Sequence, residues 1–315
     1  MSECQPISTH YTQAPITLSS ASRALYNERI MRPLINRTVL MSGARYFSVQ
    51  ELNPYSDATV QPDPARAAAE HQAIAEALKQ AGIKVIKVDE PEGCQDGIFT
   101  ANWALCRGDT AILSSLPPQR QAEQAYAEEV LRKQGKRVIK PPFRFSGQGD
   151  ALPCGNLLFM GSGYRTDPRM GQFIAENLGY KVIGLLAVPS RDKSGAPVSN
   201  RVTGWPDSFF YDIDLALAVL TPNLIAWCPE AFTAESQVTI RALALDKIEV
   251  SFQEATEHFA CNLVSSGQTV VMSAGAPKLK AAIEARGLRV VTPRIKELAK
   301  GGGYIRCTSL TLDNV

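Results

Sequence analysis

The sequence lacks the patterns that mark several common classes of protein. Its seven cysteines include no CxxC pair, and an odd number of cysteines without such pairs argues against a disulfide framework and against a zinc site. The longest apolar run, residues 213–227, is broken by Asp214 and Pro222, so it falls short of the roughly 18 to 20 residues that a membrane-spanning helix needs. We therefore expect individual reduced thiols and no membrane partner.

The chain also has little net charge. Its 33 basic and 31 acidic residues give a formal net charge of +2, so the composition offers no sign of a nucleic-acid partner. The first twenty residues lack the basic and apolar regions of a secretory signal, which predicts a cytoplasmic protein. No Gly-rich phosphate-binding fingerprint follows an early strand. Gly161-Ser162-Gly163 follows a strand-like run but lacks the third glycine and the ribose-binding acid.

What is present is a recurring pattern of secondary structure. Five helix-like segments end near a glycine and are followed at once by a β-branched strand, and a further strand-like run precedes each of them. This recurrence suggests a repeated supersecondary module. The helices are expected at residues 64–82, 120–135, 167–179, 234–245 and 276–287, the following strands at 83–88, 137–140, 180–188, 248–252 and 288–293, and the preceding strands at 38–41, 110–114, 157–160, 224–227 and 269–272.

The pattern predicts an α/β fold. Five modules could close into a ring, and the alternative is a doubly wound sheet, which the missing phosphate fingerprint disfavours. No linker long enough to separate domains lies within residues 31–315, which are expected to form a single catalytic domain. Residues 1–30, which begin with a Ser-, Thr-, Gln- and Pro-rich stretch, are expected to form a partly ordered N-terminal arm.

The clearest candidate for a reactive group lies near the C-terminus. In residues 300–312 (KGGGYIRCTSLTL), three glycines lead into a short alternating run that contains Cys307. Glycines let the backbone approach a ligand closely, at a cost in conformational entropy. We expect the thiol of Cys307 at the edge of a strand, where a nucleophile is both fixed and reachable. A flexible tail with a buried structural cysteine is the alternative. Arg306 is expected to point away, because alternate strand residues face opposite sides.

Carboxylates and amides gather in other connections. Asp96 and Asn102 flank an apolar run that reads as a strand, and Asp150 ends a Gly-x-Gly-Asp turn. Asp212 and Asp214 lie two residues apart, which would place them on one face of a strand. Carboxylates in so apolar a run need a cationic partner if they are buried. For each of these two aspartates considered alone, a position in a turn or on the surface is the alternative. Together with the glycine-presented thiol, these groups suit a planar cationic substrate that sulfur attacks.

Six motifs in one order resemble the guanidine-modifying (pentein) superfamily, which includes arginine deiminases, dimethylarginine dimethylaminohydrolases, arginine dihydrolases and amidinotransferases. The resemblance covers about residues 36–313. It implies a five-bladed α/β propeller of ββαβ modules with pseudo-fivefold symmetry about a central substrate channel. The motifs are TVLMSGARYFSVQELNPY with Asn53, QDGIFTANWAL with Asn102, FSGQGDAL with Asp150, LLFMGSGYRTD with Arg165, FFYDIDLALAVL with Asp214, and GGGYIRCTSLTL with Cys307.

The resemblance implies that the Cys307 thiolate attacks the amidine carbon of a guanidino group. An amine or ammonia would leave, and a covalent thiouronium-type adduct would remain until water or a second amine resolves it. The expected catalytic residues are Cys307, Asp212 and Asp214. The expected substrate-binding residues are Asp96, Asn102, Asp150, Arg165, Asn53 and Ser146. Among them, Arg165 would hold a substrate carboxylate or neutralise the acids.

The sequence departs from the superfamily pattern at two positions. Hydrolytic relatives usually have Phe-Glu-Gly where this chain has Phe145-Ser146-Gly147, and Tyr-His-x-Asp where it has Tyr211-Asp212-Ile213-Asp214. Asp212 could carry the proton if burial or Asp214 raised its pKa towards neutrality. Alternatively, Asp212 supplies the negative charge that Ser146 gives up, or hydrolysis is lost.

The three histidines do not obviously replace the missing one. His10 lies in the N-terminal arm, His71 is expected on a helix surface, and His258 is not expected in the site. The sequence therefore predicts a hydrolase of C–N bonds in a linear amidine or arginine-like guanidino compound, acting through a covalent Cys307 intermediate without cofactor or metal. An amidinotransferase and a non-hydrolytic pentein binding module are the alternatives. The expected partner is this small molecule, and a homodimer is left open.

Overall fold

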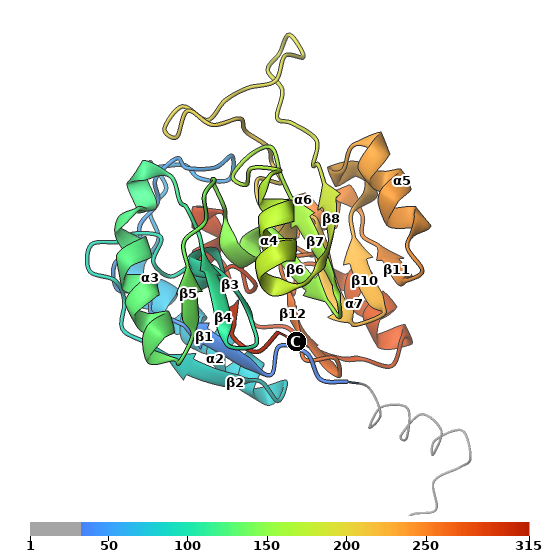
Figure 1. The fold of residues 1–315 in the computed structure, drawn as a ribbon, viewed down its shortest axis with the longest axis horizontal. Helices are drawn as coiled ribbons and strands as arrows, with labels where there is room; N and C mark the ends of the chain where they lie inside the picture. The colour runs from blue at the N-terminus through green and yellow to red at the C-terminus, as the bar shows by residue number, and fades with distance from the viewer. Residues whose placement is uncertain (1–32, 315) are drawn as a thin grey trace, which may run out of the picture. The chain divides into compact units, whose positions relative to one another are not determined.

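The structure, a computed structural model, describes residues 33–314, so the predictions for the N-terminal arm at residues 1–30 and for His10 lie outside the described residues. Within them, fifteen strands form five sheets of three strands each (Figure 1). In every sheet the middle strand pairs antiparallel with one neighbour and parallel with the other. The expected α/β class is confirmed.

The elements are short and follow one another in a regular order. The strands are β1 (Thr38–Met41), β2 (Lys84–Lys87), β3 (Ala104–Arg107), β4 (Thr110–Leu113), β5 (Arg137–Ile139), β6 (Ala151–Cys154), β7 (Leu157–Gly161), β8 (Lys181–Leu185), β9 (Leu217–Thr221), β10 (Leu224–Trp227), β11 (Asp246–Glu249), β12 (Val264–Ser265), β13 (Thr269–Val271), β14 (Arg289–Val291) and β15 (Leu310–Thr311). The helices are α2 (Pro64–Gln80), α3 (Ala122–Lys133), α4 (Met170–Leu178), α5 (Ala234–Ala242), α6 (Phe252–His258) and α7 (Pro277–Ala285).

Each helix except α6 joins the middle strand of a sheet to the parallel strand. The sheets are β15-β1-β2, β3-β4-β5, β6-β7-β8, β9-β10-β11 and β12-β13-β14, with the middle strand second in each. The first sheet takes its antiparallel strand from the far end of the sequence, because β15 pairs with β1 and places Thr311 opposite Val39. This pairing fixes the end of the chain that carries Cys307 to the first sheet.

Helix α2 shows how the local sequence sets an element. The Asp63 carboxylate accepts a hydrogen bond from the backbone N–H of Arg66 at 2.8 Å, and Pro64 occupies the first turn, where no N–H is needed. Apolar residues then recur every three or four positions, so that one face of the helix packs against the sheet. The buried residues are Ala67, His71, Ile74, Ala75, Ala77 and Leu78.

The expectation that His71 lies on a helix surface is therefore wrong. Its side chain is 3% exposed, because it lies four residues after Ala67 and three before Ile74 on the core-facing side. The Nε2 atom has no hydrogen-bond partner among the described residues. Burial, with a smaller effect of Lys87, lowers the pKa of His71 to about 4.

This lowered pKa predicts a loss of stability in acid. The folded protein favours neutral His71, so its contribution is complete above the unfolded-state pKa of 6.5 and is lost as the pH falls towards about 4. At pH 5 the loss amounts to about 2 kcal/mol. We expect the melting temperature of His71→Leu to exceed that of the wild type by more at pH 5 than at pH 7.5. An equal difference at the two pH values would contradict this.

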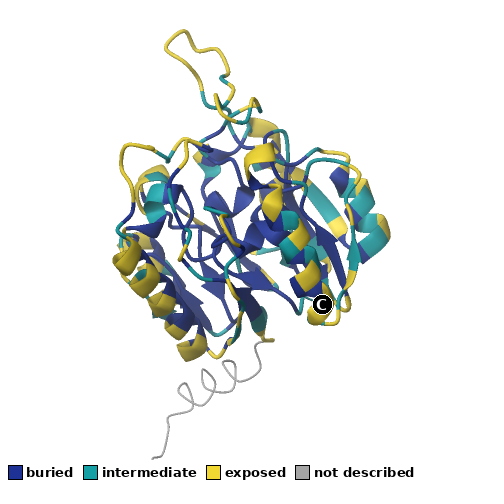
Figure 2. Cartoon of the chain, turned by 90° about the vertical axis from the view of Figure 1, so that its left-hand side faces the viewer, coloured by how far each residue is buried: buried dark blue, intermediate teal, exposed yellow. Residues whose placement is uncertain are grey.

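The interior lies among the strands. Figure 2 shows the strands mostly buried at the centre, whereas the helices carry exposed faces at the periphery. The connection between β8 and β9 projects from the rest of residues 33–314 (Figure 1). Polar side chains that belong to connections near the strand ends are buried as well, and they form the candidate site.

The predicted helices are present with slightly shorter bounds, but α6 was not predicted. The strand expected at residues 248–252 instead ends at Glu249. The reason is local, because the Ser251 hydroxyl accepts a hydrogen bond from the N–H of Glu254 and so begins α6. The repeating pattern did not include the antiparallel outer strands β15, β3, β6, β9 and β12, which directly follow irregular turns. The strand expected between Asp96 and Asn102 is wrong, because this run is a turn that leads into a 3₁₀ helix at Thr100–Trp103, and β3 begins only at Ala104.

Candidate active site

Five polar residues occupy equivalent places in the five sheets. Each lies no more than three residues before the strand that pairs antiparallel with the middle strand of its sheet. Because the five sheets repeat one topology, these places lie at corresponding strand ends, and hydrogen bonds join several of them. The residues are Asn102 before β3, Asp150 before β6, Asp214 before β9, Asn262 before β12 and Cys307 before β15.

Cys307 lies in a turn and not in a strand as expected. The N–H of Thr308 donates to the carbonyl of Tyr304 at 3.3 Å, and β15 begins only at Leu310. The thiol Sγ accepts a hydrogen bond from Asn262 Nδ2 at 3.1 Å and donates to Asp214 Oδ2 at 3.4 Å. With an exposed fraction of 3%, the thiol is held from two sides in the interior.

Asn262 was missed by the sequence reasoning. Its Oδ1 accepts hydrogen bonds from the backbone N–H of Arg306 at 2.9 Å and of Cys307 at 3.2 Å, while its Nδ2 donates to the sulfur. One amide therefore fixes both the turn and the thiol that the turn presents. Its position just before β12, the fourth of five equivalent positions, is the signal that could have found it.

Within the glycine triplet, position 302 is one that requires glycine. Its φ is +81°, in the left-handed region that favours glycine, and a Cβ there would overlap the Asn53 amide. Asn53 Nδ2 donates to the carbonyl of Gly301 at 3.0 Å, and its Oδ1 accepts from the N–H of Tyr55 at 2.9 Å. Both polar ends of Asn53, expected to bind substrate, are thus bonded to backbone and fasten the segment after β1 to the glycine loop.

Asp212 and Asp214 do not share one face of a strand, so that prediction is wrong. Residues 213–215 form a 3₁₀ turn before β9, and Asp150 Oδ1 holds this turn by accepting from the N–H of Ile213 at 2.9 Å. Asp214 consequently contacts the sulfur, whereas Asp212 Oδ2 accepts from Asn102 Nδ2 at 2.9 Å. Both carboxyl groups are buried, and the Oδ1 of each has no hydrogen-bond partner among the described residues.

Arg165 is the cation that pairs with Asp212. Its Nη1 lies 3.4 Å from Asp212 Oδ2, and its Nη2 donates to the carbonyl of Leu52 at 3.1 Å. The guanidinium also lies 4.0 Å from the centre of the Tyr211 ring. Arg165 therefore forms an ion pair with one acid of the site, and its role towards a substrate stays a prediction.

Asp96 has its cationic partner in Arg120, which the sequence reasoning did not single out. Arg120 Nε lies 3.6 Å from Asp96 Oδ2, and the same guanidinium forms two hydrogen bonds of 2.8 Å with Glu123. Arg120 Nη1 also donates to Asn102 Oδ1 at 2.9 Å, which orients the amide so that its Nδ2 faces Asp212. Burial, opposed by Arg120, raises the pKa of Asp96 to about 6.

Ser146 stands beside Asn102. Its Oγ and its carbonyl oxygen each accept from Asn102 Nδ2 at 3.0 Å, and its own N–H donates to Thr166 Oγ1 at 3.1 Å. The structure thus brings Ser146, Asn102 and Asp212 together, while Asp96 is linked to them through Arg120.

Asp150, Asp214 and the thiol of Cys307 have raised pKa values. Burial, with a smaller contribution from the charge of Asp212, raises the pKa of Asp150 to about 8 and that of Asp214 well above its usual range. Burial and the charge of Asp214 likewise raise the pKa of Cys307. A cation placed among these groups would favour their charged forms and lower all three pKa values.

The raised pKa of Asp150 predicts that stability falls as the pH rises. The folded state favours protonated Asp150, so its contribution is complete below the unfolded-state pKa of 3.8 and is lost as the pH rises towards about 8. We expect the wild-type melting temperature to fall between pH 6 and pH 8.5, and Asp150→Asn to lose much of this slope. Asp192→Asn, at an exposed position, is the control that keeps the slope. Equal slopes in wild type and Asp150→Asn would refute the assignment.

Neither of the two described histidines lies in this site. His258 ends α6 and lines a separate cavity of about 470 Å³ with Ser273 and Tyr304. Within residues 33–314, no group of three or more His, Cys, Asp or Glu side chains could hold a metal ion. In the same range, no helix has both the length and the apolar character needed to cross a membrane.

Comparisons with known proteins identify a family and further relatives in the guanidine-modifying superfamily. Residues 51–312 match the family described as N,N dimethylarginine dimethylhydrolase, eukaryotic. The chain is 31% identical over 278 residues to the N(G),N(G)-dimethylarginine dimethylaminohydrolase of Mycobacterium tuberculosis, covering 88% of this chain and 86% of that protein. It is 28% identical over 266 residues to the bifunctional arginine dihydrolase/ornithine cyclodeaminase AgrE of Nostoc, covering 82% of this chain but only 35% of that protein.

A solved structure extends this similarity to the fold. The N-terminal domain of ArgZ, covalently bound to a reaction intermediate, superposes with a TM-score of 0.79 at 25% identity, covering 88% of this chain and 98% of that one.

Proposed function

Because this chain belongs to the N,N-dimethylarginine dimethylhydrolase family of the guanidine-modifying superfamily, we propose that it hydrolyses a C–N bond of an arginine-like guanidino or amidine compound through Cys307. One observation carries the proposal: the thiol contacts Asp214, which is one of three buried carboxyl groups, with Asp150 and Asp212, that act on one another electrostatically. Among the described residues, Arg165 is the cation that forms an ion pair with this cluster. A guanidinium would supply the missing positive charge and the donors for the free carboxylate oxygens.

We infer that the five sheets are the blades of an α/β propeller with pseudo-fivefold symmetry, and that residues 31–315 form one catalytic domain. The repeated ββαβ order supports this arrangement. So do the contacts between neighbouring sheets, in which β15 meets β3, β6 meets β9, and β9 meets β12. The equivalent places of the five polar residues would then converge on a single central site.

Asp214 is proposed to take the thiol proton, because its carboxyl group is the one in contact with Cys307 Sγ. The bound guanidinium favours the thiolate, which attacks the amidine carbon and forms the C–S bond. The proton returned by Asp214 to the substituted nitrogen lets the C–N bond break, so that an amine or ammonia leaves. Water then attacks the same carbon, and the C–S bond breaks to release a ureido product. One proton of the water passes through Asp214 to the sulfur, which restores the thiol, and the other is released to solvent.

The carboxylate of Asp212, where relatives usually have histidine, is proposed to bind the guanidinium after Arg165 releases it. Arg165 in turn would bind a carboxylate of the substrate, since a guanidinium and a carboxylate form paired hydrogen bonds. Asn102, oriented by Arg120, would donate to the same cluster. Ser146, whose Oγ accepts from Asn102 Nδ2, would line the same site, and Asp96 supports the arrangement through its contact with Arg120.

Activity on a panel of guanidino compounds tests the proposal. Arginine, its N-methylated forms and decarboxylated analogues are incubated with the enzyme, and ureido and amine products are measured by mass spectrometry. Product that forms only when an amine acceptor is added would assign amidino transfer instead. A lack of both turnover and Cys307 modification by a haloacetamidine would assign a binding module. The cytoplasmic location stays a prediction, and a homodimer stays an open option.

A further inference from the structure

Arg306 is a buried guanidinium that the proposed reaction does not use. Its side chain is 5% exposed, its Nη1 donates to Thr311 Oγ1 at 3.1 Å, and its Nε has no hydrogen-bond partner among the described residues. The arginines Arg120 and Arg165, by contrast, each pair with a carboxylate. No ion pair is formed by Arg306 within residues 33–314. The carboxyl group of Asp214 acts on Arg306 only at longer range. A buried cation without an ion-paired counter-ion is costly, so the site favours an anion.

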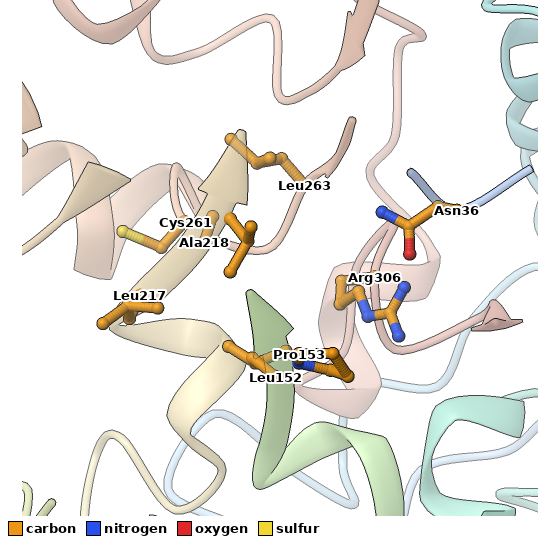
Figure 3. Close-up of a pocket in the computed structure, with 9 residues that line it drawn as sticks. Asn36, Leu152, Pro153, Leu217, Ala218, Cys261, Leu263 and Arg306 are labelled. Atoms are coloured by element: carbon orange, nitrogen blue, oxygen red, sulfur yellow. The ribbon is translucent and has the colours of Figure 1, made fainter. Parts of the chain in front are cut away.

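Arg306 lines a small cavity of about 20 Å³, with Asn36 beside it in the wall (Figure 3). Arg306 is the one charged residue among those that line it. Asn36, also in the wall, has its amide engaged, because Nδ2 donates to the carbonyl of Ser265 and Oδ1 accepts from Thr311. The remaining wall is formed by Leu152, Pro153, Leu217, Ala218, Val219, Cys261 and Leu263.

We propose that this cavity binds one small monovalent anion of the halide class on the guanidinium of Arg306. The volume is slightly above the roughly 10 to 15 Å³ that a single water-sized sphere requires, so sulfate and phosphate are too large. The wall carries no carboxylate that would repel the anion, and its apolar side chains strengthen the attraction of the guanidinium by excluding solvent. The site is separate from Cys307, which is not among the lining residues.

The location links the anion site to the thiol. Asn262 Oδ1 accepts from the N–H groups of both Arg306 and Cys307, and its Nδ2 donates to Sγ. The positive charge of Arg306 also lowers the pKa of Asp214, and a bound anion would offset that effect. Anion binding would therefore stabilise the turn that presents the nucleophile.

Thermal denaturation in chloride against gluconate, at constant pH and ionic strength, tests the proposal. We expect chloride to raise the wild-type melting temperature in a saturable manner, by roughly 1 to 3 °C. Bromide should act similarly, and sulfate should not. Arg306→Gln should lose the shift, whereas Arg201→Gln, which removes the same charge at an exposed position, should keep it. The proposal would be contradicted if the wild-type melting temperature were the same in chloride and in gluconate, or if Arg306→Gln kept the full chloride-dependent shift.

Diffraction from wild-type crystals soaked in bromide tests the anion site directly and does not depend on whether Arg306→Gln folds. The expected result is an anomalous peak within hydrogen-bond distance of the Arg306 guanidinium. Density there without anomalous signal would identify a water molecule and overturn the proposal.

Discussion

Cys307→Ala is expected to lower turnover of a guanidino substrate by at least about 10⁴-fold, because the variant lacks the atom that forms the covalent bond. The fold should persist. The side chain is small, and the hydrogen bonds of Asn262 to the backbone of residues 306 and 307 do not involve the sulfur. Steady-state kinetics with the best substrate of the panel, together with thermal denaturation, measure the two effects.

Cys154→Ala is the matched control. Cys154 is another buried cysteine, but it lies in β6 and contacts the backbone carbonyls of Thr221 and Pro222 rather than the acids of the site. We expect this variant to lose some stability and to retain its turnover. Substantial activity in Cys307→Ala would rule out covalent catalysis by this residue.

Asp214→Asn is expected to lower kcat by about 10²- to 10⁴-fold, the usual range for loss of a proton-transferring group. The Asn side chain has nearly the same shape but cannot accept the thiol proton. The same change removes a negative charge that raises the pKa of Cys307, so alkylation of the thiol should become detectable at a lower pH than in the wild type. The pH dependence of alkylation gives a readout that a purely structural defect would not shift in this direction.

The variant Asp212→Asn distinguishes the role of the Asp212 carboxyl group from that of Asp214. On the sequence alone, Asp212 is one candidate for the proton carrier, and that role predicts that this variant loses turnover with its fold intact. The geometry favours Asp214, because Asp212 contacts Asn102 and Arg165 instead of the sulfur. We therefore expect Asp212→Asn to act mainly on KM, by weakening the grip on a cationic substrate, and Asp214→Asn to act mainly on kcat. If Asp212→Asn instead lowered mainly kcat and Asp214→Asn changed mainly KM, Asp212 would be the proton carrier.

Much of the fold followed from local sequence signals. The helices could be placed because each combines an apolar periodicity with a terminal signal, such as Asp63 before α2 and Gly179 after α4. The pairing of β15 with β1 could not be read locally, since two short strands at opposite ends of the sequence carry no pattern that identifies them as partners. His71 was misplaced because the alanine-rich α2 offers little contrast between its two faces.

The candidate site was partly predictable for similar reasons. Cys307 and the acids stand out as polar groups in apolar or glycine-rich surroundings. The separation of Asp212 from Asp214 depends on a turn that the distant Asp150 side chain holds, so strand alternation gave the wrong result. Asn262 was missed because a single asparagine has no distinctive spacing, although the repeated module places it at the position that Cys307 occupies in its own sheet.

Mass spectrometry of enzyme quenched in acid during turnover tests the central claim most directly. The account predicts that the peptide containing Cys307 gains the mass of an amidino-type adduct, which appears with substrate, decays when substrate is exhausted and is absent from Cys307→Ala. An unmodified Cys307 peptide throughout productive turnover, together with an adduct on another residue or with none, would contradict it.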